Sequence, residues 1–121
     1  MKRSITAVAL FTLATFAHAG QTLELKDLIQ ENGKRVQLLK QGMSRADVVR
    51  IMSDDVAQIP GGTVGNPYKA KSFQQGSEAY EVLYYVTQQP SRESNAVTTP
   101  VILKNGVVNG LGIDALRALK Q

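Results

Sequence analysis

Three segments of the chain carry residues whose types and spacing could do chemistry. Ser44 with Asp47 could supply a nucleophile and an acidic group, Asp54-Asp55 could hold a cation, and the glycine-rich run 61–65 could cradle a phosphate. A serine nucleophile needs a base within hydrogen-bonding reach, calcium needs six or more oxygen ligands, and a phosphate loop needs a following Lys-Ser or Lys-Thr and a helix. The flanking sequence offers none of these. The residues therefore favour a helix cap, a solvated helix end and a flexible loop.

The first 19 residues have the three-part layout of an exported precursor. Lys2 and Arg3 are followed by the uncharged apolar stretch Ile5–Phe16, and Ala17-His18-Ala19 then places small residues before Gly20. The apolar stretch is too short to span a bilayer. We expect residues 1–19 to be a cleaved signal peptide, residues 20–121 to form a single domain, and the mature protein to be periplasmic.

Removal of this segment limits what the mature domain can do. His18 is the only histidine and the chain has no cysteine, so a disulfide framework, a thiolate nucleophile, the usual Cys/His zinc site and a histidine base are all excluded. Gly20 stands where a bacterial lipoprotein would carry its acylated cysteine, which predicts no membrane anchor. The formal charge of +4 falls to +2 without Lys2 and Arg3. The remaining charges are scattered, which argues against nucleic acid as a partner.

The first half of the mature chain predicts helices. Apolar residues recur at spacings of three and four from Thr22 to Leu39, a stripe that also includes Asn32. Ser44 is a suitable N-cap for a second helix that ends near Ser53, and Gly42 suits the end of the first. We expect these two helices to form a hairpin. The stretch 54–68 is rich in glycine and proline and predicts a loop.

The second half changes to a period of two, which is typical of strands. The pattern predicts an edge strand at Lys69–Gln74 and a longer strand at Ala79–Gln88. Asn105-Gly106 lies between two apolar runs and predicts a tight hairpin, and 113–120 predicts a short terminal helix. The expected fold class is α+β, with two N-terminal helices as a helical hairpin packed on a three- to four-stranded antiparallel sheet.

The strand at Ala79–Gln88 presents two different faces. One face is wholly apolar or aromatic and is expected to pack on the helices; it comprises Tyr80, Val82, Tyr84 and Val86. The other carries Leu83 and Tyr85. This second face is either covered by another part of the chain or open to bind a partner, since aromatic residues dominate interface hot spots and antiparallel sheets often leave one face exposed.

Several of these residues resemble a known family. Leu39-Lys40-Gln41-Gly42-Met43-Ser44, with Val48 four residues on, resembles the L-x-x-G-M-[ST]-x-x-x-V signature of the SmpA/OmlA (BamE-like) superfamily. One branch of it, small exported bacterial proteins of unknown function, is similar in Asn66-Pro67-Tyr68, Phe73, the run 80–85 and Lys104-Asn105-Gly106. The resemblance implies two helices on a three- or four-stranded antiparallel sheet. Its best-known members assist insertion of outer-membrane β-barrel proteins, and inhibitors of β-lactamase share the architecture.

These observations lead to three functional hypotheses. The first is a non-catalytic binding or scaffold protein of the cell envelope, without cofactor or metal, that contacts unidentified envelope proteins, with a possible link to outer-membrane assembly or maintenance. Its candidate partner-binding residues are Asn66, Pro67, Tyr68, Leu83 and Tyr85. The second is an inhibitor of a periplasmic or foreign enzyme that inserts the loop 61–67 into an active site. The third is a Ser- or Asp-dependent enzyme, which would need a polar pocket with a base beside its nucleophile.

Overall fold

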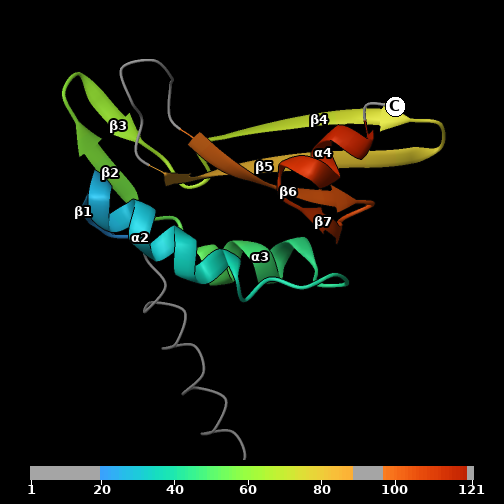
Figure 1. The fold of residues 1–121 in the computed structure, drawn as a ribbon, viewed down its shortest axis with the longest axis horizontal. Coiled ribbons are helices and arrows are strands. Elements are labelled where there is room, and N and C mark those ends of the chain that lie inside the picture. The colour runs from blue at the N-terminus through green and yellow to red at the C-terminus, as the bar shows by residue number, and fades with distance from the viewer. Residues whose placement is uncertain (1–19, 89–96, 120–121) are drawn as a thin grey trace, which may run out of the picture.

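The period-two half of the chain forms the larger of two β-sheets (Figure 1). A computed structural model describes residues 20–88 and 97–119, and no helix in that part of the chain has the length and apolarity needed to cross a membrane. The predicted signal peptide lies outside the described residues. The elements follow in the order β1 (Thr22–Glu24), α2 (Leu25–Val36), α3 (Arg45–Met52), β2 (Val56–Ile59), β3 (Gly62–Val64), β4 (Lys69–Gln75), β5 (Glu78–Gln88), β6 (Val97–Lys104), β7 (Val107–Leu111) and α4 (Ile113–Leu119).

The predicted fold, a helical hairpin on one three- to four-stranded sheet, is wrong. The described chain is dominated by strands, which form a β1-β2-β3 sheet and a β4-β5-β6-β7 sheet. The residues 22–24, expected to begin a helix, form β1 instead, and β1 pairs in parallel with β2 through Leu23 and Ala57. The predicted loop 54–68 contains β2 and β3, joined by a turn at Pro60-Gly61. The pairing of β1 with β2 joins residues more than thirty positions apart, and the local periodicity of the sequence cannot predict such a pairing.

The larger sheet is antiparallel and confirms the strand predictions. β4 and β5 pair from Lys69 with Tyr84 to Gln75 with Glu78, and their hairpin extends beyond the end of β6 and β7 (Figure 1). Asn105 and Gly106 connect β6 to β7 with φ angles of 53° and 84°, as a turn with positive φ at both central residues requires.

The residues around Gly42 carry out two structural tasks. Gly42 has a φ of 94°, and its N–H donates to the Val108 carbonyl. Val108 in turn donates to the Met43 carbonyl, so that this segment covers the outer edge of β7. The Ser44 side chain accepts the Asp47 N–H, which confirms the predicted N-cap of α3. The signature-like residues therefore protect a sheet edge and begin α3. The prediction that Gly42 ends the first helix is wrong, because α2 ends at Val36 with Gln37 as its C-cap.

The face of β5 that packs on the helices is the opposite of the one expected. Leu83 and Tyr85 are fully buried in a cluster with Val48 and Met52 of α3. Val82 and Tyr84 face α4 on the other side of the sheet. Both faces of β5 carry large apolar side chains, so alternation alone does not determine which one the helices cover. Val86 packs in a second cluster near β2 and β3, beside a β-bulge.

Replacement of Leu83 by alanine should lower the free energy of unfolding by about 3 kcal/mol, because it leaves a cavity in a fully buried cluster. The matched control is Val107→Ala, since Val107 is 41% exposed and should cost less than about 0.5 kcal/mol. Urea denaturation measures both. A loss of stability at Leu83 no greater than at Val107 would contradict the packing of α3 on this face.

Candidate functional site

The residues that suggested chemistry have structural roles in the described chain. The Ser44 hydroxyl oxygen accepts the Asp47 N–H, and the Asp47 carboxylate accepts a hydrogen bond from Arg50 at 2.6 Å. The hydrogen bond from Arg50 lowers the pKa of Asp47, and a hydrogen bond with the Ser44 side chain adds a smaller effect in the same direction. These contacts are those of a capped helix N-terminus, in which the Asp47 carboxylate is paired with Arg50. No group of three or more His, Cys, Asp or Glu side chains that could hold a metal ion occurs in residues 20–88 and 97–119. Residues 62–64 of the glycine-rich run belong to β3.

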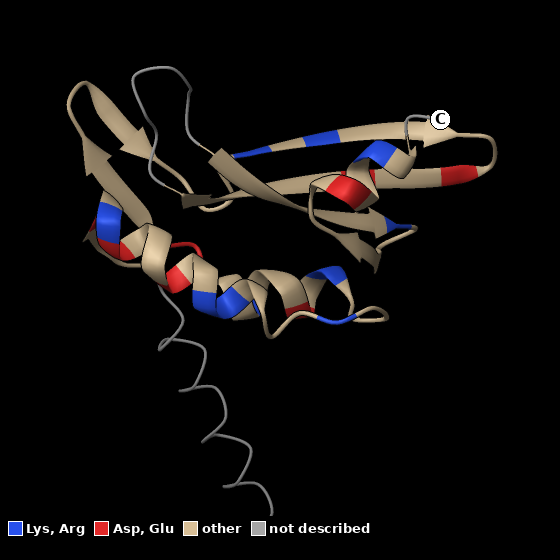
Figure 2. Cartoon of the chain, viewed as in Figure 1, with Lys and Arg blue, Asp and Glu red and all other residues tan. Residues whose placement is uncertain are grey.

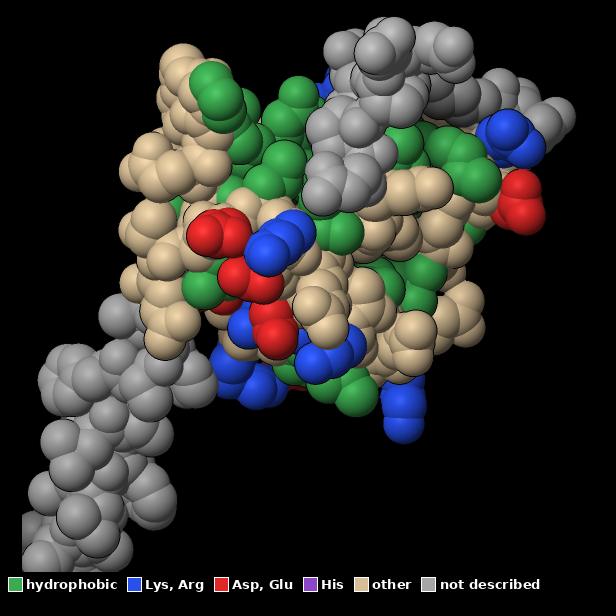
Figure 3. All heavy atoms as spheres, turned by 60° about the vertical axis from the view of Figure 1, so that its left-hand side comes forward, with side chains coloured by type: hydrophobic (Ala, Val, Ile, Leu, Met, Phe, Trp, Pro, Cys, Tyr) green, Lys and Arg blue, Asp and Glu red, His purple; other side chains and the backbone are tan. Residues whose placement is uncertain are grey.

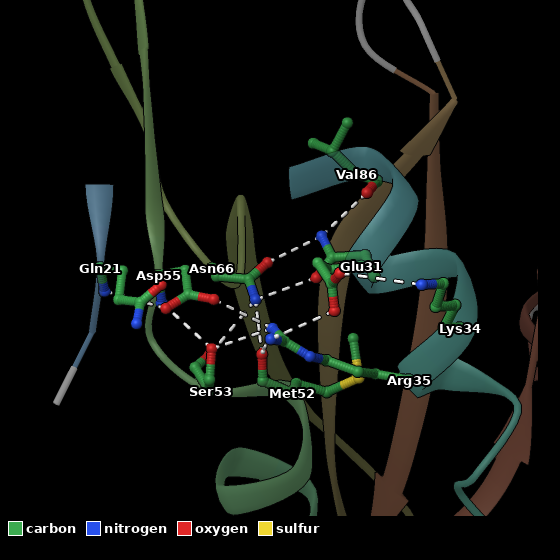
Figure 4. A network of polar contacts seen from close by, with 10 residues as sticks. Gln21, Glu31, Lys34, Arg35, Met52, Ser53, Asp55, Asn66 and Val86 are labelled. Carbon is green, nitrogen blue, oxygen red and sulfur yellow. Dashed lines mark hydrogen bonds and ion pairs between the residues drawn. The ribbon is translucent and has the colours of Figure 1, made fainter. Parts of the chain in front are cut away.

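The candidate residue Asn66 belongs to a buried network of amides (Figure 4). Asn66 and Asn32 exchange hydrogen bonds between their side chains, at 2.9 and 3.0 Å. The Asn32 amide also donates to the Val86 carbonyl, and the Asn66 amide donates to the Met52 carbonyl at 2.8 Å. The pair therefore connects α2, the end of α3, β5 and the segment before β4. Because both amides are occupied and buried, Asn66 is not available to a partner.

Arg35 and Asp55 extend this network toward β1. The Arg35 guanidinium donates to the Met52 carbonyl, the Ser53 hydroxyl and the Asp55 carboxylate at 3.0–3.1 Å (Figure 4). The other Asp55 oxygen accepts the Gln21 N–H at 2.9 Å. Asp55, suggested above as one of two cation ligands, is in fact a buried acceptor that ties the start of β1 to α2.

The charge of Asp55 is maintained by these contacts. Burial of the carboxyl opposes its ionisation, but hydrogen bonds from the Gln21 N–H, Arg35 and Ser53, together with the positive charge of Arg35, outweigh that effect and lower the pKa of Asp55 below 3.8. A carboxyl whose pKa is lower in the folded chain contributes stability above the pKa of the unfolded chain. That stability is lost as the pH falls through the folded pKa.

Removal of either buried amide should destabilise the fold strongly. Asn32→Ala and Asn66→Ala should each lower the free energy of unfolding by about 2 kcal/mol, because each leaves the other amide buried without its partner. The double variant should cost clearly less than the sum of the two, since both changes remove the same interaction. Urea denaturation of the four proteins measures this coupling. Additive losses would show that the two amides do not act as a pair.

The contribution of Asp55 should depend on pH. Asp55→Asn should be less stable than the wild type above pH 5, and the difference should shrink as the pH falls below 3.8 and the wild-type carboxyl is protonated. Asp54→Asn is the matched control, because Asp54 is the adjacent carboxyl and is exposed. Thermal denaturation between pH 2 and 7 tests this. A stability difference that stays constant over that range would contradict the role of the Asp55 charge.

A groove lies between β4 and α4. Its volume is about 710 Å³. Val82 and Tyr84 of β5 lie at its base, Leu116 and Leu119 of α4 line one side, and β4 lines the other. The lining residues of β4 are Lys71, Ser72, Phe73, Gln74 and Gln75. Every residue of β4 is exposed. The groove therefore combines an apolar base with an accessible strand.

Aromatic side chains are fixed beside this groove. The Phe73 ring stacks on Tyr80 with 5.3 Å between ring centroids and 14° between ring planes. The Lys69 ammonium lies 5.0 Å from the centroid of the Tyr84 ring, within the range of a cation–π interaction. Phe73 keeps 39% of its surface exposed, so the stacked pair presents an apolar edge to solvent.

Unpaired positive charge is concentrated on the same face. Within residues 20–88 and 97–119, four cations have no ion pair with a described acidic residue: Lys40, Lys69, Lys71 and Lys104. The pairings of Lys69 with Tyr84, Lys71 with Val82 and Lys104 with Tyr80 place the last three on the α4 face of the sheet. Two of them are visible as blue bands along β4 (Figure 2).

The opposite end of the molecule has a different charge pattern. Acidic and basic side chains lie next to one another around α2 (Figure 3). Lys26 is within 3.8 Å of Glu24, and Glu31 pairs with both Lys34 and Arg35. Charges of opposite sign are therefore balanced there. The β4–α4 side is where a charged partner would find an excess of one sign.

The five candidate partner-binding residues do not form one surface. Leu83 and Tyr85 are in the core under α3, and burial raises the pKa of Tyr85 to about 12. The hypothesis of an open face there is wrong for both, because the helices cover it. Asn66 is buried in the amide network and Pro67 is half-buried. Tyr68, 43% exposed, lies next to the start of β4 and is the one candidate near the groove.

The sequence prediction missed the groove although it located its strands. Lys69, Lys71 and Phe73 alternate along the predicted edge strand, which is the signal that places them on one face. Their relation to Leu116 and Leu119 depends on where α4 returns to the sheet. Gly110 permits that return, because a Cβ there would lie 2.9 Å from the Ala115 Cβ.

Comparisons with known proteins add no identification. No protein-family model matches the chain, and neither a curated protein nor a solved structure matches it. The resemblance to the SmpA/OmlA (BamE-like) superfamily therefore stays a prediction.

Proposed function

We propose that this chain is a non-catalytic binding protein of the cell envelope that contacts its partner through the β4–α4 side of the larger sheet. The observation that carries the proposal is the edge strand β4, every residue of which is exposed, beside a groove of about 710 Å³ with an apolar base. Exposed aromatic and apolar side chains beside a groove are typical of interaction sites. Lys71 and Ser72 both line the groove, but consecutive residues of a strand point to opposite faces, so the two are not placed as a nucleophile with its base.

The export prediction supports the location of this activity. Cleavage of a signal peptide at residues 1–19 would leave residues 20–121 as the mature domain in the periplasm. We propose no cofactor, no nucleic acid and no membrane anchor for the mature protein. Its partners would be envelope proteins, and a role in outer-membrane assembly or maintenance is consistent with the resemblance described above.

The inhibitor hypothesis has less support from the geometry. The segment 61–67 was expected to be a free loop, but β3 occupies residues 62–64 and Asn66 is held in the buried amide network. The turn at Pro60-Gly61 and the first two residues of β3 are exposed, but Val64 and Asn66 are buried. Insertion of the whole segment into an active site would require the amide pair to break.

Site-specific crosslinking in intact cells tests the proposed surface. A photoreactive phenylalanine analogue at Phe73 should crosslink to an envelope protein, because Phe73 is exposed at the groove. The matched control is the same analogue at Leu38, which is exposed at 58% and lies after α2, outside the groove.

The proposal predicts a discrete crosslinked product at Phe73 that is absent at Leu38. Products of equal yield at both positions, or none at either position with normal export, would contradict a partner site at the β4–α4 side.

A further inference from the structure

We propose that β4 receives an extended segment of the partner as an added antiparallel strand, and that this segment carries acidic residues opposite Lys69 and Lys71 and an apolar residue opposite Phe73. This inference rests on the proposed function and specifies the chemistry of its partner. It belongs to the strand-addition mode of recognition, in which backbone hydrogen bonds give affinity and alternate side chains give specificity.

The two edges of the larger sheet differ in what covers them. The outer edge of β7 is occupied, since Gly42 and Arg45 donate backbone N–H groups to Val108 and Gly106, and Val108 donates to Met43. β4 is the opposite edge, and no described strand pairs with its outer side. An exposed edge of seven residues presents a row of backbone donors and acceptors to another chain.

The pairing pattern identifies which amides of β4 point outward. Asn105 donates its backbone N–H to the Ala79 carbonyl at 2.7 Å, so the polar backbone groups of Ala79 face β6. Successive residues of a strand direct their N–H and C=O groups to opposite sides, so the polar backbone groups of Tyr80 face β4, where Tyr80 pairs with Phe73. Phe73 consequently directs its N–H toward β5. The alternation places the N–H groups of Ala70, Ser72 and Gln74 on the open side.

The lysines select the sign of the partner's charge. Lys69 and Lys71 are two residues apart on β4, on one face, without an acidic partner among the described residues. Lysines on an edge strand discourage pairing with neutral or basic strands, because the lysine ammonium groups would then lie opposite apolar or positively charged side chains. An acidic strand reverses this effect. The same residues thus protect the edge against aggregation and admit a strand of opposite charge.

The groove accounts for the apolar position. Phe73 lies on the same face as Lys71, and a residue opposite Phe73 on an added strand would project on the α4 side of the sheet. There the stacked rings of Phe73 and Tyr80 and the apolar side chains of Leu116 and Leu119 offer contact surface. An aliphatic side chain would be removed from water at this position.

The probe is a short peptide with blocked ends and the sequence Thr-Leu-Thr-Glu-Thr-Glu-Thr. Paired antiparallel to β4, it places leucine opposite Phe73 and the two glutamates opposite Lys71 and Lys69. We expect calorimetry at low salt to detect binding to the full mature chain. A second peptide with lysines in place of the glutamates should bind at least about tenfold more weakly, and added salt should weaken the acidic peptide.

Ser72→Pro removes one outward N–H and should weaken binding by about tenfold, because proline is tolerated on the open side of an edge strand but cannot donate. Ser72→Ala keeps the amide and is the matched control. A peptide methylated on the backbone nitrogens that face β4 lacks the donors on its own side and should also bind more weakly to the unaltered protein. This second test does not depend on how Ser72→Pro folds.

Lys69→Gln with Lys71→Gln should weaken binding about fivefold or more at low salt, whereas Lys40→Gln, which alters an unpaired lysine away from the sheet face, should have no effect. Equal binding of the acidic and basic peptides, or full binding of the N-methylated peptide, would overturn strand addition. The envelope crosslink at Phe73 could still form in that case. Loss of the crosslink with peptide binding intact would instead reject the envelope partner and retain the site.

Discussion

The reciprocal hydrogen bonds between Asn32 and Asn66 are the interaction on which the rest of this structure depends. A buried amide pair is costly to break and loses little to solvent competition. It is also placed where four separate parts of the chain meet, since the Val86 and Met52 carbonyls accept from the same two side chains. Arg35 and Asp55 continue the connection to the start of β1. The smaller sheet is thereby attached to the helices and to β5.

This arrangement determines which side of the larger sheet is available. With α2 and α3 held by the amide network, Leu83 and the other residues on that face are used for the core. The short helix α4 covers only part of the other face: the Gln75 side chain at the end of β4 donates to the Leu119 carbonyl, but every residue of β4 stays exposed. The site for a partner is therefore a consequence of uneven coverage. One face of a four-stranded sheet is filled by two helices, and the other is filled by one helix of seven residues.

Local pattern predicted the elements whose causes are local. The Ser44 cap, the period-two strands and the Asn105-Gly106 turn each depend on neighbouring residues, and the structure contains all three. The parallel pairing of β1 with β2 and the burial of Asn66 depend on residues more than thirty positions away. Asn32 stood in the predicted apolar stripe of α2, which indicated its burial. Nothing near it in the sequence indicated its partner. The groove was missed for the same reason, since its two sides come from β4 and α4.

Hydrogen exchange of the β4 amides, measured by NMR with and without the acidic peptide, tests the central claim most directly. In the free protein the outward N–H groups of Ala70, Ser72 and Gln74 should exchange rapidly, while those of Lys71 and Phe73 should be protected by β5. Saturation with the peptide should slow the exchange of the outward N–H groups by about tenfold or more, and should leave the exchange of the Lys71 and Phe73 N–H groups unchanged. Peptide binding with no added protection at Ser72 would contradict strand addition at this edge.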